Sequence, residues 1–358
     1  MKYIDEFRDA ALVDKLIVAI KRESAKRMRI MEVCGGHTLA IRKYGIQHLL
    51  PCNIELMSGP GCPVCVTNRT AIDNAIALAR EPGIIIATYG DLLRVPGSDS
   101  SLNLEKALGA DVRIVYSTLD ALDIAKVNPG KNVVFLGIGF ETTTPSSAVA
   151  ILEAANQRIS NFYLLSMHKL MPPAMNALIE QGIQIDGYIG PGHVSAIAGA
   201  DMYKPLVSAH KLAVVIAGFE PVDILQSILM LVAMHEENRH GVEIQYKRVV
   251  TPSGNVKACE LVSRVFEPCD DSWRGLGMIR NSGLAIRREY SKYDASVHFD
   301  MADTPAHEPG GCLCGEVLRG LKKPVQCSLF GKVCTPANPV GACMVSGEGA
   351  CQAYFNYR

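Results

Sequence analysis

Two cysteines separated by two residues form the most chemically distinctive motif of the chain. Cys62 and Cys65 lie in the segment Gly59–Cys65 (GPGCPVC), between a short apolar run and a helical pattern over 67–80. Backbone N–H groups at a helix N-terminus stabilise a thiolate, because they carry partial positive charge. We therefore expect these thiols to bind metal or to cycle between dithiol and disulfide. The alternative is two small buried side chains in a turn.

A second cysteine motif, Cys34–Thr38 (CGGHT), follows the apolar run Arg29–Val33. Its two glycines allow another molecule to approach the backbone closely. The Cys34 thiolate and the His37 imidazole could together bind a metal or perform nucleophilic chemistry. The alternative is a buried cysteine followed by a capping histidine.

The C-terminal segment is rich in cysteine. Six of the twelve cysteines lie within its last 47 residues: Cys312, Cys314, Cys327, Cys334, Cys343 and Cys351. In a reducing compartment such a density favours metal binding over disulfides. The segment has no pair of CxxC knuckles, as a zinc ribbon would, and its wide spacing suits an iron–sulfur cluster wrapped by loops. Four thiolates hold such a cluster, so two cysteines would be spare; structural zinc remains an alternative.

Further polar residues follow other apolar runs. Gly137 and Gly139 resemble half of a dinucleotide-binding fingerprint, which is a weak signal. The threonines at 142–144 can cap the following helix, with Pro145 in its first turn. Four more residues at strand ends form a candidate site if they face one cleft: Glu141, His168, His193 and Glu220.

The elements that position these residues are short apolar runs alternating with helical patterns. The expected strands are 29–33, 54–57, 84–88, 113–116, 133–136, 162–165, 187–189 and 212–216. Fully apolar strands separated by helices predict an α/β fold with two doubly wound parallel-sheet domains. A single large α/β domain and a closed (β/α)8 barrel are alternatives. Ligands of open parallel sheets bind beyond the carboxyl ends of the strands, where all the motifs above lie.

The expected domains are 1–118, with the CGGHT and GPGCPVC motifs; 119–237, with GFETT (139–143) and PGHVS (191–195); and the cysteine-rich 238–358. A strand is expected over 245–250, a helix over 257–266 and a turn over 273–277. From residue 305 on, glycine, proline and cysteine dominate. This region cannot build much apolar core alone, so it needs a stabilising cross-link.

Composition excludes several functions. The chain has 36 basic and 36 acidic residues and no long basic run, so nothing suggests nucleic acid as a partner. No apolar stretch is long enough to span a membrane, and the N-terminal residues do not resemble a secretory signal. We therefore expect a cytoplasmic protein.

Taken together, these motifs resemble one family closely, the NiFe-hydrogenase maturation factor HypD family. The resemblance rests on residues 34–38, 59–65, 139–143, 191–195 and the tail that ends in Cys351, and it covers essentially the whole chain. It implies a scaffold on which an iron ion receives two cyanides and one carbon monoxide before insertion into the hydrogenase large subunit. The iron would be held between this protein and a small HypC-type chaperone. A HypE-type partner would deliver cyanide made from carbamoyl phosphate through HypF.

The resemblance also implies roles for single residues. Cys34 would be the main ligand of the scaffold iron, and Cys62 and Cys65 would take part in redox chemistry or bind that iron. His37, Glu141 and His193 are further candidates for the chemistry. One 4Fe-4S cluster would be held by Cys314, Cys327, Cys334 and Cys351, with Cys312 and Cys343 spare.

Three functions are therefore compared. The first is an assembly scaffold with redox activity, which would bind stoichiometric iron beyond its cluster and would not be a turnover enzyme. The second is an iron–sulfur-dependent thiol–disulfide reductase that uses Cys62 and Cys65 catalytically. The third and weakest is a nucleotide-binding enzyme that uses the loop at Gly137.

Overall fold

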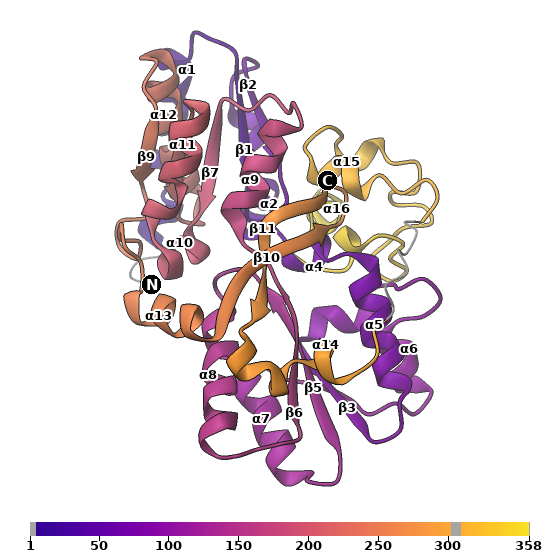
Figure 1. Cartoon of the computed structure of the whole chain (residues 1–358). Coiled ribbons are helices and arrows are strands. Elements are labelled where there is room, and N and C mark those ends of the chain that lie inside the picture. Colours follow the sequence, from indigo (N-terminus) through magenta and orange to yellow (C-terminus); the bar gives the residue numbers. More distant parts are fainter. Residues whose placement is uncertain (1–4, 302–308, 358) are drawn as a thin grey trace.

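Two separate parallel sheets form the frame of the molecule (Figure 1). The computed structural model describes residues 5–301 and 309–357. The five-stranded sheet has the order β2 (Ile54–Ser58), β1 (Met28–Glu32), β7 (Gly187–Pro191), β8 (Ala213–Ala217), β9 (Gly241–Ile244). The four-stranded sheet has the order β4 (Val112–Ile114), β3 (Ile84–Thr88), β5 (Asn132–Gly139), β6 (Phe162–His168). All neighbouring strands in both sheets are parallel.

The α/β class and the two parallel sheets are confirmed, and the closed barrel is wrong. The chain enters the five-stranded sheet with β1 and β2, builds the whole four-stranded sheet, and then returns with β7, β8 and β9. The segments 1–118 and 119–237 each contribute strands to both sheets, so the sheets do not follow those boundaries. Apolar strand patterns indicate that a strand is buried but not which sheet it joins.

Helices cover both faces of the sheets. Their bounds are α1 (Ala10–Glu23), α2 (Gly35–Lys43), α3 (Ile46–Leu49), α4 (Pro63–Val66), α5 (Arg69–Arg80), α6 (Leu102–Ala107), α7 (Thr118–Val127), α8 (Thr144–Asn156), α9 (Met171–Glu180), α10 (Gly192–Ala198), α11 (Lys204–His210), α12 (Pro221–Glu236), α13 (Val256–Val265), α14 (Ala295–His298), α15 (Cys314–Leu318) and α16 (Ala350–Asn356). Short 3-10 helices are η1 (Asp5–Arg8), η2 (Gly90–Arg94), η3 (Ala200–Tyr203), η4 (Arg288–Tyr293), η5 (Pro324–Gln326) and η6 (Ala342–Met344).

Local sequence explains where these elements begin and why they are buried. Asn68 and Asp9 accept hydrogen bonds from backbone N–H groups in the first turns of α5 and α1, as expected of N-cap residues. Strands β3 and β8 are buried along their whole length, because helices or the other chain segments cover both of their faces. Helices α1 and α12 pack together on one face of the five-stranded sheet.

An antiparallel hairpin packs against the four-stranded sheet. Its strands are β10 (Phe266–Trp273) and β11 (Gly277–Ile286), and the predicted turn at 273–277 connects them. The Leu170 N–H donates to the Ser282 carbonyl, and Trp273 forms a bridge with Thr67, so the hairpin contacts both β6 and the segment after α4. The hairpin crosses the middle of the molecule in Figure 1. The helix predicted over 257–266 is confirmed, whereas the strand predicted over 245–250 is wrong because β9 ends at Ile244.

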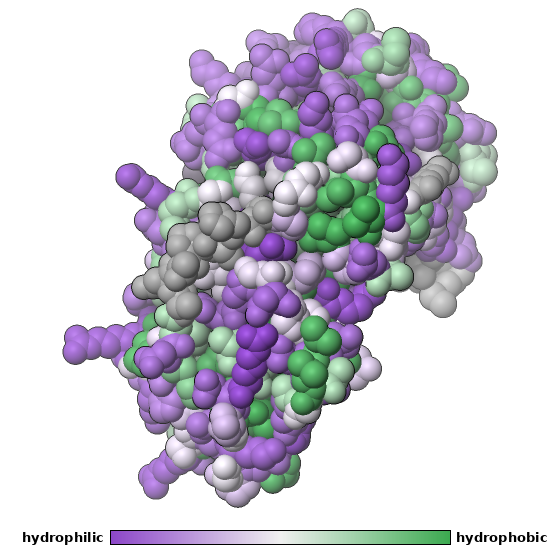
Figure 2. Space-filling model, turned by 90° about the vertical axis from the view of Figure 1, so that its right-hand side faces the viewer, coloured by the Kyte–Doolittle hydropathy of each residue, from purple (hydrophilic) through white to green (hydrophobic). Residues whose placement is uncertain are grey.

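The segment 309–357, called the tail below, has little regular structure. It packs against α2 and α4: Arg42 of α2 donates to the Tyr357 carbonyl, and η6 contacts α4. Figure 2 views the molecule from the side of the tail and shows apolar side chains gathered within a largely hydrophilic surface. Among the described residues, no helix has the length and apolar character needed to cross a membrane.

Candidate functional site

The candidate site lies at the carboxyl edge of the five-stranded sheet, where its strand order reverses between β1 and β7. Such a reversal separates the loops that leave the two strands, and it is where open α/β sheets bind ligands. Cys34 follows β1 directly, and His193 lies in the first turn of α10 after β7. The sheet therefore brings together two motifs that are more than 150 residues apart in sequence.

Cys34 is buried in a turn fixed by a buried carboxylate. The Cys34 N–H donates to Glu32 Oε2 at 3.2 Å, and Thr38 Oγ1 donates to Glu32 Oε1 at 2.6 Å. Burial raises the pKa of Glu32 to about 8 and the pKa of the Cys34 thiol to about 12. Without a cation, Cys34 is therefore a neutral thiol at neutral pH. A bound metal ion would reverse this preference, because it stabilises the thiolate.

The GPGCPVC turn packs directly on the backbone of Cys34. The Gly35 N–H donates to the Gly61 carbonyl at 3.0 Å, and a Cβ on Gly61 would lie only 2.2 Å from the Cys34 nitrogen. Cys62 and Cys65 form a disulfide in this structure, with Cα atoms 5.2 Å apart, and both are buried. The redox-capable pair thus lies beside Cys34, as the strand-end placement of both motifs predicts.

Three aromatic rings are stacked next to Cys34. Phe219 lies between His37 and His193, with ring centroids 4.7 and 4.0 Å away. A Cβ on Gly36 would lie 3.1 Å from the Phe219 ring and 3.8 Å from Cys34 Sγ. The ring and the sulfur atom therefore both lie next to Gly36. His37 is fully buried and His193 is exposed, so the stack runs from the interior to the surface.

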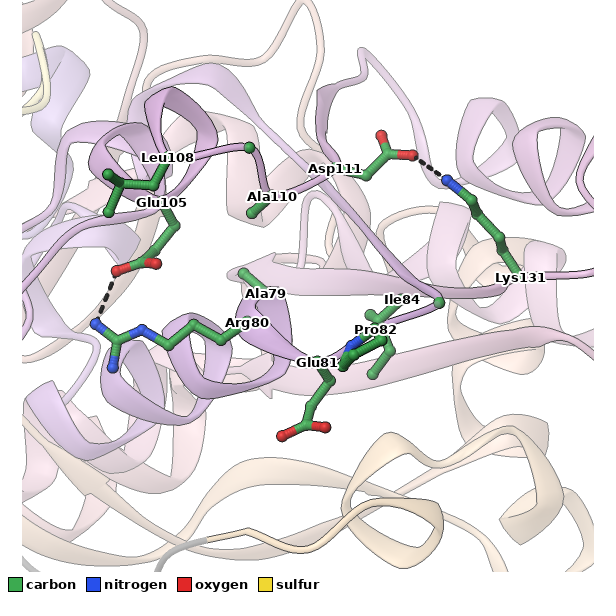
Figure 3. A pocket seen from close by; sticks show the side chains of 12 residues that line it. Ala79, Arg80, Glu81, Pro82, Ile84, Glu105, Leu108, Ala110, Asp111 and Lys131 are labelled. Atoms are coloured by element: carbon green, nitrogen blue, oxygen red, sulfur yellow. Dashed lines mark hydrogen bonds and ion pairs between the residues drawn. The ribbon is translucent and has the colours of Figure 1, made fainter.

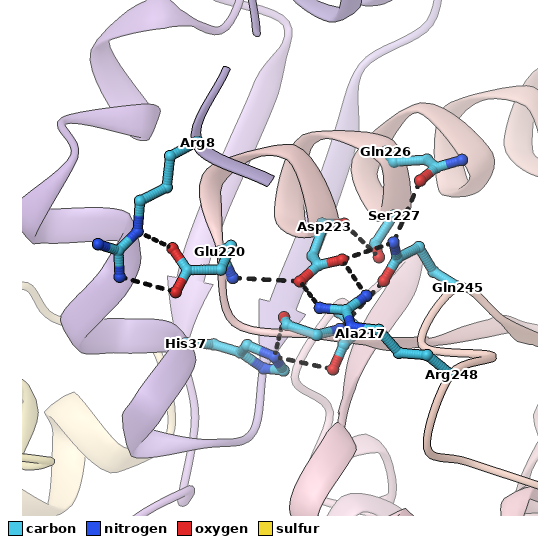
Figure 4. A network of polar contacts seen from close by, with 10 residues as sticks. Arg8, His37, Ala217, Glu220, Asp223, Gln226, Ser227, Gln245 and Arg248 are labelled. Carbon is cyan, nitrogen blue, oxygen red and sulfur yellow. Dashed lines mark hydrogen bonds and ion pairs between the residues drawn. The ribbon is translucent and has the colours of Figure 1, made fainter. Parts of the chain in front are cut away.

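Hydrogen bonds orient the inner ring of this stack. His37 Nε2 lies 3.0 Å from the Gly218 carbonyl and 3.3 Å from the Ala217 carbonyl (Figure 4). Both partners are acceptors, so Nε2 carries the proton and Nδ1 carries the lone pair. Burial lowers the pKa of His37 to about 4, which keeps the ring neutral.

A buried ion pair holds the loop that carries Phe219. Asp223 is fully buried and accepts two hydrogen bonds from Arg248, at 2.8 and 2.6 Å (Figure 4). Gln245 Nε2 donates to the same carboxylate at 2.9 Å, and the Glu220 N–H donates to it at 3.3 Å. The Glu220 side chain itself binds Arg8. Glu220 therefore has a structural role within the described network.

Glu141 reaches the region from the other sheet. Its Oε1 accepts from the Met171 N–H at 3.0 Å, and its Oε2 is buried without a hydrogen-bond partner among the described residues. Burial raises the pKa of Glu141 to about 7. Burial raises the pKa of Tyr203, and Glu141 and Cys34 raise it further.

The expectation that four residues share one cleft receives only partial support. His193 belongs to the stack beside Cys34, whereas Glu141 lies just after β5 of the other sheet. His168 instead lies 2.9 Å from Ser147 Oγ and packs edge-on against Phe266. Its partners are therefore Ser147 of α8 and Phe266 of β10. A strand-end position predicts an edge, but not which of two sheets carries it.

The tail forms a small pocket lined mainly by cysteine and apolar side chains. Its cysteines are Cys312, Cys314, Cys327, Cys334 and Cys351. Gly341 also lines it, and a Cβ there would lie 2.8 Å from Cys312 Sγ and 3.0 Å from Cys314 Sγ. Hydrogen bonds from Cys314 and Cys343 lower the pKa of Cys351 to about 6. The pocket therefore combines several thiols, one of them readily ionised, with little space and no competing carboxylate among its lining residues.

The cysteines expected to hold a cluster lie together in this pocket. Within the described ranges, no three His, Cys, Asp or Glu side chains are arranged to hold one metal ion. All four expected cluster ligands line the pocket, and so does the expected spare Cys312. Cys343 is the fully buried partner of Cys314 and Cys351.

The tail also closes over the Cys34 turn. A Cβ on Gly35 would lie 2.3 Å from the Cβ of Glu348, so the tail backbone there packs on the first residue of α2. Arg94 donates to the Val345 carbonyl at 3.0 Å and ties the tail to η2 as well. The cysteine pocket, the Cys62–Cys65 disulfide and Cys34 therefore belong to one packed region.

Larger hollows elsewhere carry no comparable chemistry. One of about 420 Å³ lies at the amino ends of β3 and β5, the opposite edge of the four-stranded sheet (Figure 3). Four of its charged side chains form two ion pairs: Arg80 binds Glu105 at 2.7 Å, and Lys131 binds Asp111 at 3.0 Å. Size alone is therefore a poor guide to the site of this chain.

Comparison with known proteins agrees with this geometry. The protein-family model HypD, described as "Hydrogenase formation hypA family", matches residues 11–358. The chain belongs to the HypD family. It is 51% identical to hydrogenase maturation factor HypD2 of Bradyrhizobium diazoefficiens, with 100% of this chain and 97% of that protein covered. It is 49% identical to hydrogenase maturation factor HypD of Rhizobium leguminosarum bv. viciae (100% and 96% covered). It is 45% identical to a putative hydrogenase expression/formation protein of Methanocaldococcus jannaschii (98% and 98% covered).

Several residues of the site were not singled out from the sequence. Glu32 could have been noticed, since a carboxylate inside an otherwise apolar strand needs a reason to be buried. Phe219 lies in a strand-end turn, but nothing in its neighbours predicts a ring placed between two histidines. Tyr203 and Glu348 become part of the family's site region only through the fold.

Proposed function

We propose that this chain is a hydrogenase maturation scaffold on which an iron ion, held by Cys34, receives two cyanides and one carbon monoxide. The observation that carries the proposal is the position of Cys34: a buried thiol at the reversal point of the five-stranded sheet, directly beneath the GPGCPVC turn. A soft thiolate suits a low-spin iron with π-acceptor ligands. Names of the relatives support hydrogenase maturation, and the assembly of this particular iron unit is our proposal.

The surroundings of Cys34 favour a role in holding iron over chemistry in open solvent. The stack of His37, Phe219 and His193 and the packed tail lie around Cys34, which is only 9% exposed. Exclusion of water strengthens every charge interaction within the site. A small HypC-type chaperone would supply a second ligand to the iron, and a HypE-type protein would supply cyanide; both are proposed partners.

We further propose that Cys314, Cys327, Cys334 and Cys351 hold one 4Fe-4S cluster in the tail pocket. When bound, such a cluster supplies single electrons to the neighbouring region. The four cysteines line one pocket, and the Gly341 position in its lining has no room for a Cβ; both observations support this assignment. Reduction of the Cys62–Cys65 disulfide consumes two electrons and two protons, and it would leave two thiols close to the scaffold iron.

An infrared spectrum of the chain, purified without oxygen together with a co-expressed small chaperone, tests the scaffold proposal. Metal-bound cyanide and carbon monoxide absorb in a window free of protein bands. We expect these bands in the unmodified chain and their loss in Cys34→Ala, with the cluster intact. Cys52→Ala is the matched control, because Cys52 is an exposed cysteine outside the site. Bands that persist in Cys34→Ala would contradict the role of Cys34.

A thiol–disulfide reductase is the second candidate, favoured by the disulfide beside the tail pocket. The reductase candidate makes a different prediction. The chain alone, with an electron donor, would then reduce many molecules of a small disulfide without any partner protein. Turnover that requires Cys62 and Cys65, together with absence of the infrared bands, would favour this candidate over the scaffold.

A further inference from the structure

The outer edge of β2 is an open strand edge. In the described sheet β2 pairs only with β1, so its other side has no strand partner. The Met28 N–H donates to the Asn53 carbonyl, and the Gly59 N–H donates to the Glu32 carbonyl. Because backbone groups alternate along a strand, residues 54, 56 and 58 point their N–H and C=O groups outward. Leu56 and Ser58 therefore present backbone groups that could pair with a further strand.

A groove runs along this edge. Two hollows, of about 430 and 340 Å³, border β2 and share Glu55, Leu56 and Lys323. The tail segment 320–326 forms the opposite wall of the second hollow. An open strand edge facing a wall of side chains is the geometry in which an extended peptide adds to a sheet. An open strand edge promotes aggregation. An edge that is kept open in a folded protein therefore suggests that it binds a partner.

The groove has an excess of positive charge. Lys322 and Lys323 are exposed, and neither lies within ion-pair distance of a carboxylate in the described part of the chain. The only carboxylate that lines the groove, Glu55, already lies 3.7 Å from Arg27 and 3.4 Å from Arg29. This charge favours an acidic occupant and disfavours a second copy of the same edge, since two positive grooves would face each other.

We propose that the β2 edge and the 320–326 wall bind an extended acidic segment of a partner protein, which adds to the five-stranded sheet as a further strand. Leu321 lines this wall and is 49% exposed, so it offers an apolar contact to a side chain of that segment. Because β2 runs directly into the GPGCPVC turn, one end of the bound segment would lie beside the candidate site. The inference rests on the proposed function for the identity of the partner, which would be a maturation protein.

Hydrogen exchange of the backbone tests this pairing directly. The probes are a purified HypC-type chaperone and a purified HypE-type protein, each added to the whole chain, with complex formation followed by size-exclusion chromatography. We expect the amides of Leu56 and Ser58 to exchange at least about tenfold more slowly in one complex than in the free chain, as amides do when they join a strand ladder. A complex that forms without such protection would overturn this inference and leave the scaffold proposal standing. Failure of both proteins to bind would contradict the proposed function and this inference together.

Two variants separate backbone pairing from side-chain contacts. Leu56→Pro removes the outward N–H, which an edge strand tolerates, whereas Leu56→Thr changes the side chain and keeps the N–H. We expect only the proline variant to lose the complex.

Charge reversal provides a second, surface-only test. The double variant Lys322→Glu/Lys323→Glu should weaken binding by about tenfold or more, and less so at high salt. Lys211→Glu/Lys257→Glu, far from the groove in sequence, is the control. Equal binding by both double variants, or protection of β2 that appears when the chain alone is concentrated, would overturn the acidic-partner assignment.

Discussion

Gly61 is the residue through which the two N-terminal cysteine motifs touch. Its missing side chain lets the GPGCPVC turn approach the Cys34 backbone, because a Cβ there would lie 2.2 Å from the Cys34 nitrogen and 2.5 Å from its Cα. Backbone cannot yield as a flexible side chain can. We expect Gly61→Ala to lower the free energy of unfolding by about 3 kcal/mol through overpacking, and to displace Cys34.

Urea unfolding of this variant measures the effect, with Gly130→Ala as the control. Gly130 has open space where its Cβ would be. Its substitution should change stability by less than about 0.5 kcal/mol, as surface changes usually do. Equal stabilities for the two variants would contradict the close approach.

His168 makes the stability of the chain depend on acid. Burial lowers its pKa to about 4, whereas an unfolded histidine has a pKa near 6.5. Between these values the unfolded chain binds a proton that the folded chain does not. Its contribution to stability is therefore complete above about pH 6.5 and is lost as the pH falls toward 4.

The variant His168→Gln removes this titration and keeps a side chain able to hydrogen-bond Ser147. Relative to the unmodified chain, it should gain stability on going from pH 7 to pH 5, by an amount on the order of 1–2 kcal/mol. Urea unfolding at both pH values is the measurement. A constant difference between the two proteins would show that His168 titrates normally in the folded chain.

At the scale of elements, a buried ion pair holds the β10–β11 hairpin against β6. Lys169 follows β6, its side chain is 3% exposed, and its Nζ lies 2.5 Å from Asp271 Oδ2 on β10. The Ser272 carbonyl accepts a second hydrogen bond at 3.0 Å. Burial lowers the pKa of Lys169, so the carboxylate is what keeps the ammonium group charged.

Removing that carboxylate should loosen the hairpin. We expect Asp271→Ala to destabilise the chain by about 3 kcal/mol, because it leaves a buried cation without its counter-ion. Asp123→Ala breaks the exposed Lys126–Asp123 pair of α7 and should cost at most about 1 kcal/mol. Denaturation of both variants measures these losses of stability. Similar losses would mean that the buried pair contributes little to the stability of the chain.

The same scale shows what the sequence could predict. The apolar runs predicted eight strands at nearly their observed places, because each run is a short, continuous apolar segment that is buried at least in part. The two strands of the hairpin were not predicted. Polar and apolar residues alternate only imperfectly in β10 and β11, and a bulge between Cys269 and Asp271 interrupts their pairing. Its contacts with Lys169 and Thr67 are long-range and leave no local pattern.

At the scale of the whole molecule, the two sheets are interleaved along the chain. Motifs at strand ends were correctly expected at carboxyl edges, which is why Cys34, the CxxC turn and His193 were found together. The partition of strands between two sheets was out of reach, since it depends on which strand edges pair, and pairing involves backbone groups common to all residues. For the same reason His168, at the end of β6, lies apart from the Cys34 turn.

The packing of the tail on the Cys34 turn leads to a prediction about the whole molecule. If Cys351 holds the cluster, Cys351→Ala should lose iron and sulfide, and the tail, which has little regular structure, should lose its order. Because the tail backbone at Glu348 covers Gly35, this loss should also expose Cys34 to solvent. Alkylation of Cys34 would then be faster by an order of magnitude or more, about as expected when a closed region opens.

Cys343→Ala is the matched control for this experiment. Cys343 is fully buried beside Cys314 and Cys351, so its loss should cost about 1 kcal/mol as a small cavity and leave the cluster in place. Iron and sulfide analysis, hydrogen exchange over 309–357 and the alkylation rate of Cys34 are measured on both variants. An intact cluster in Cys351→Ala would refute the ligand assignment. A lost cluster with unchanged alkylation would instead show that the Cys34 turn is closed by the sheet and the aromatic stack alone, independently of the tail.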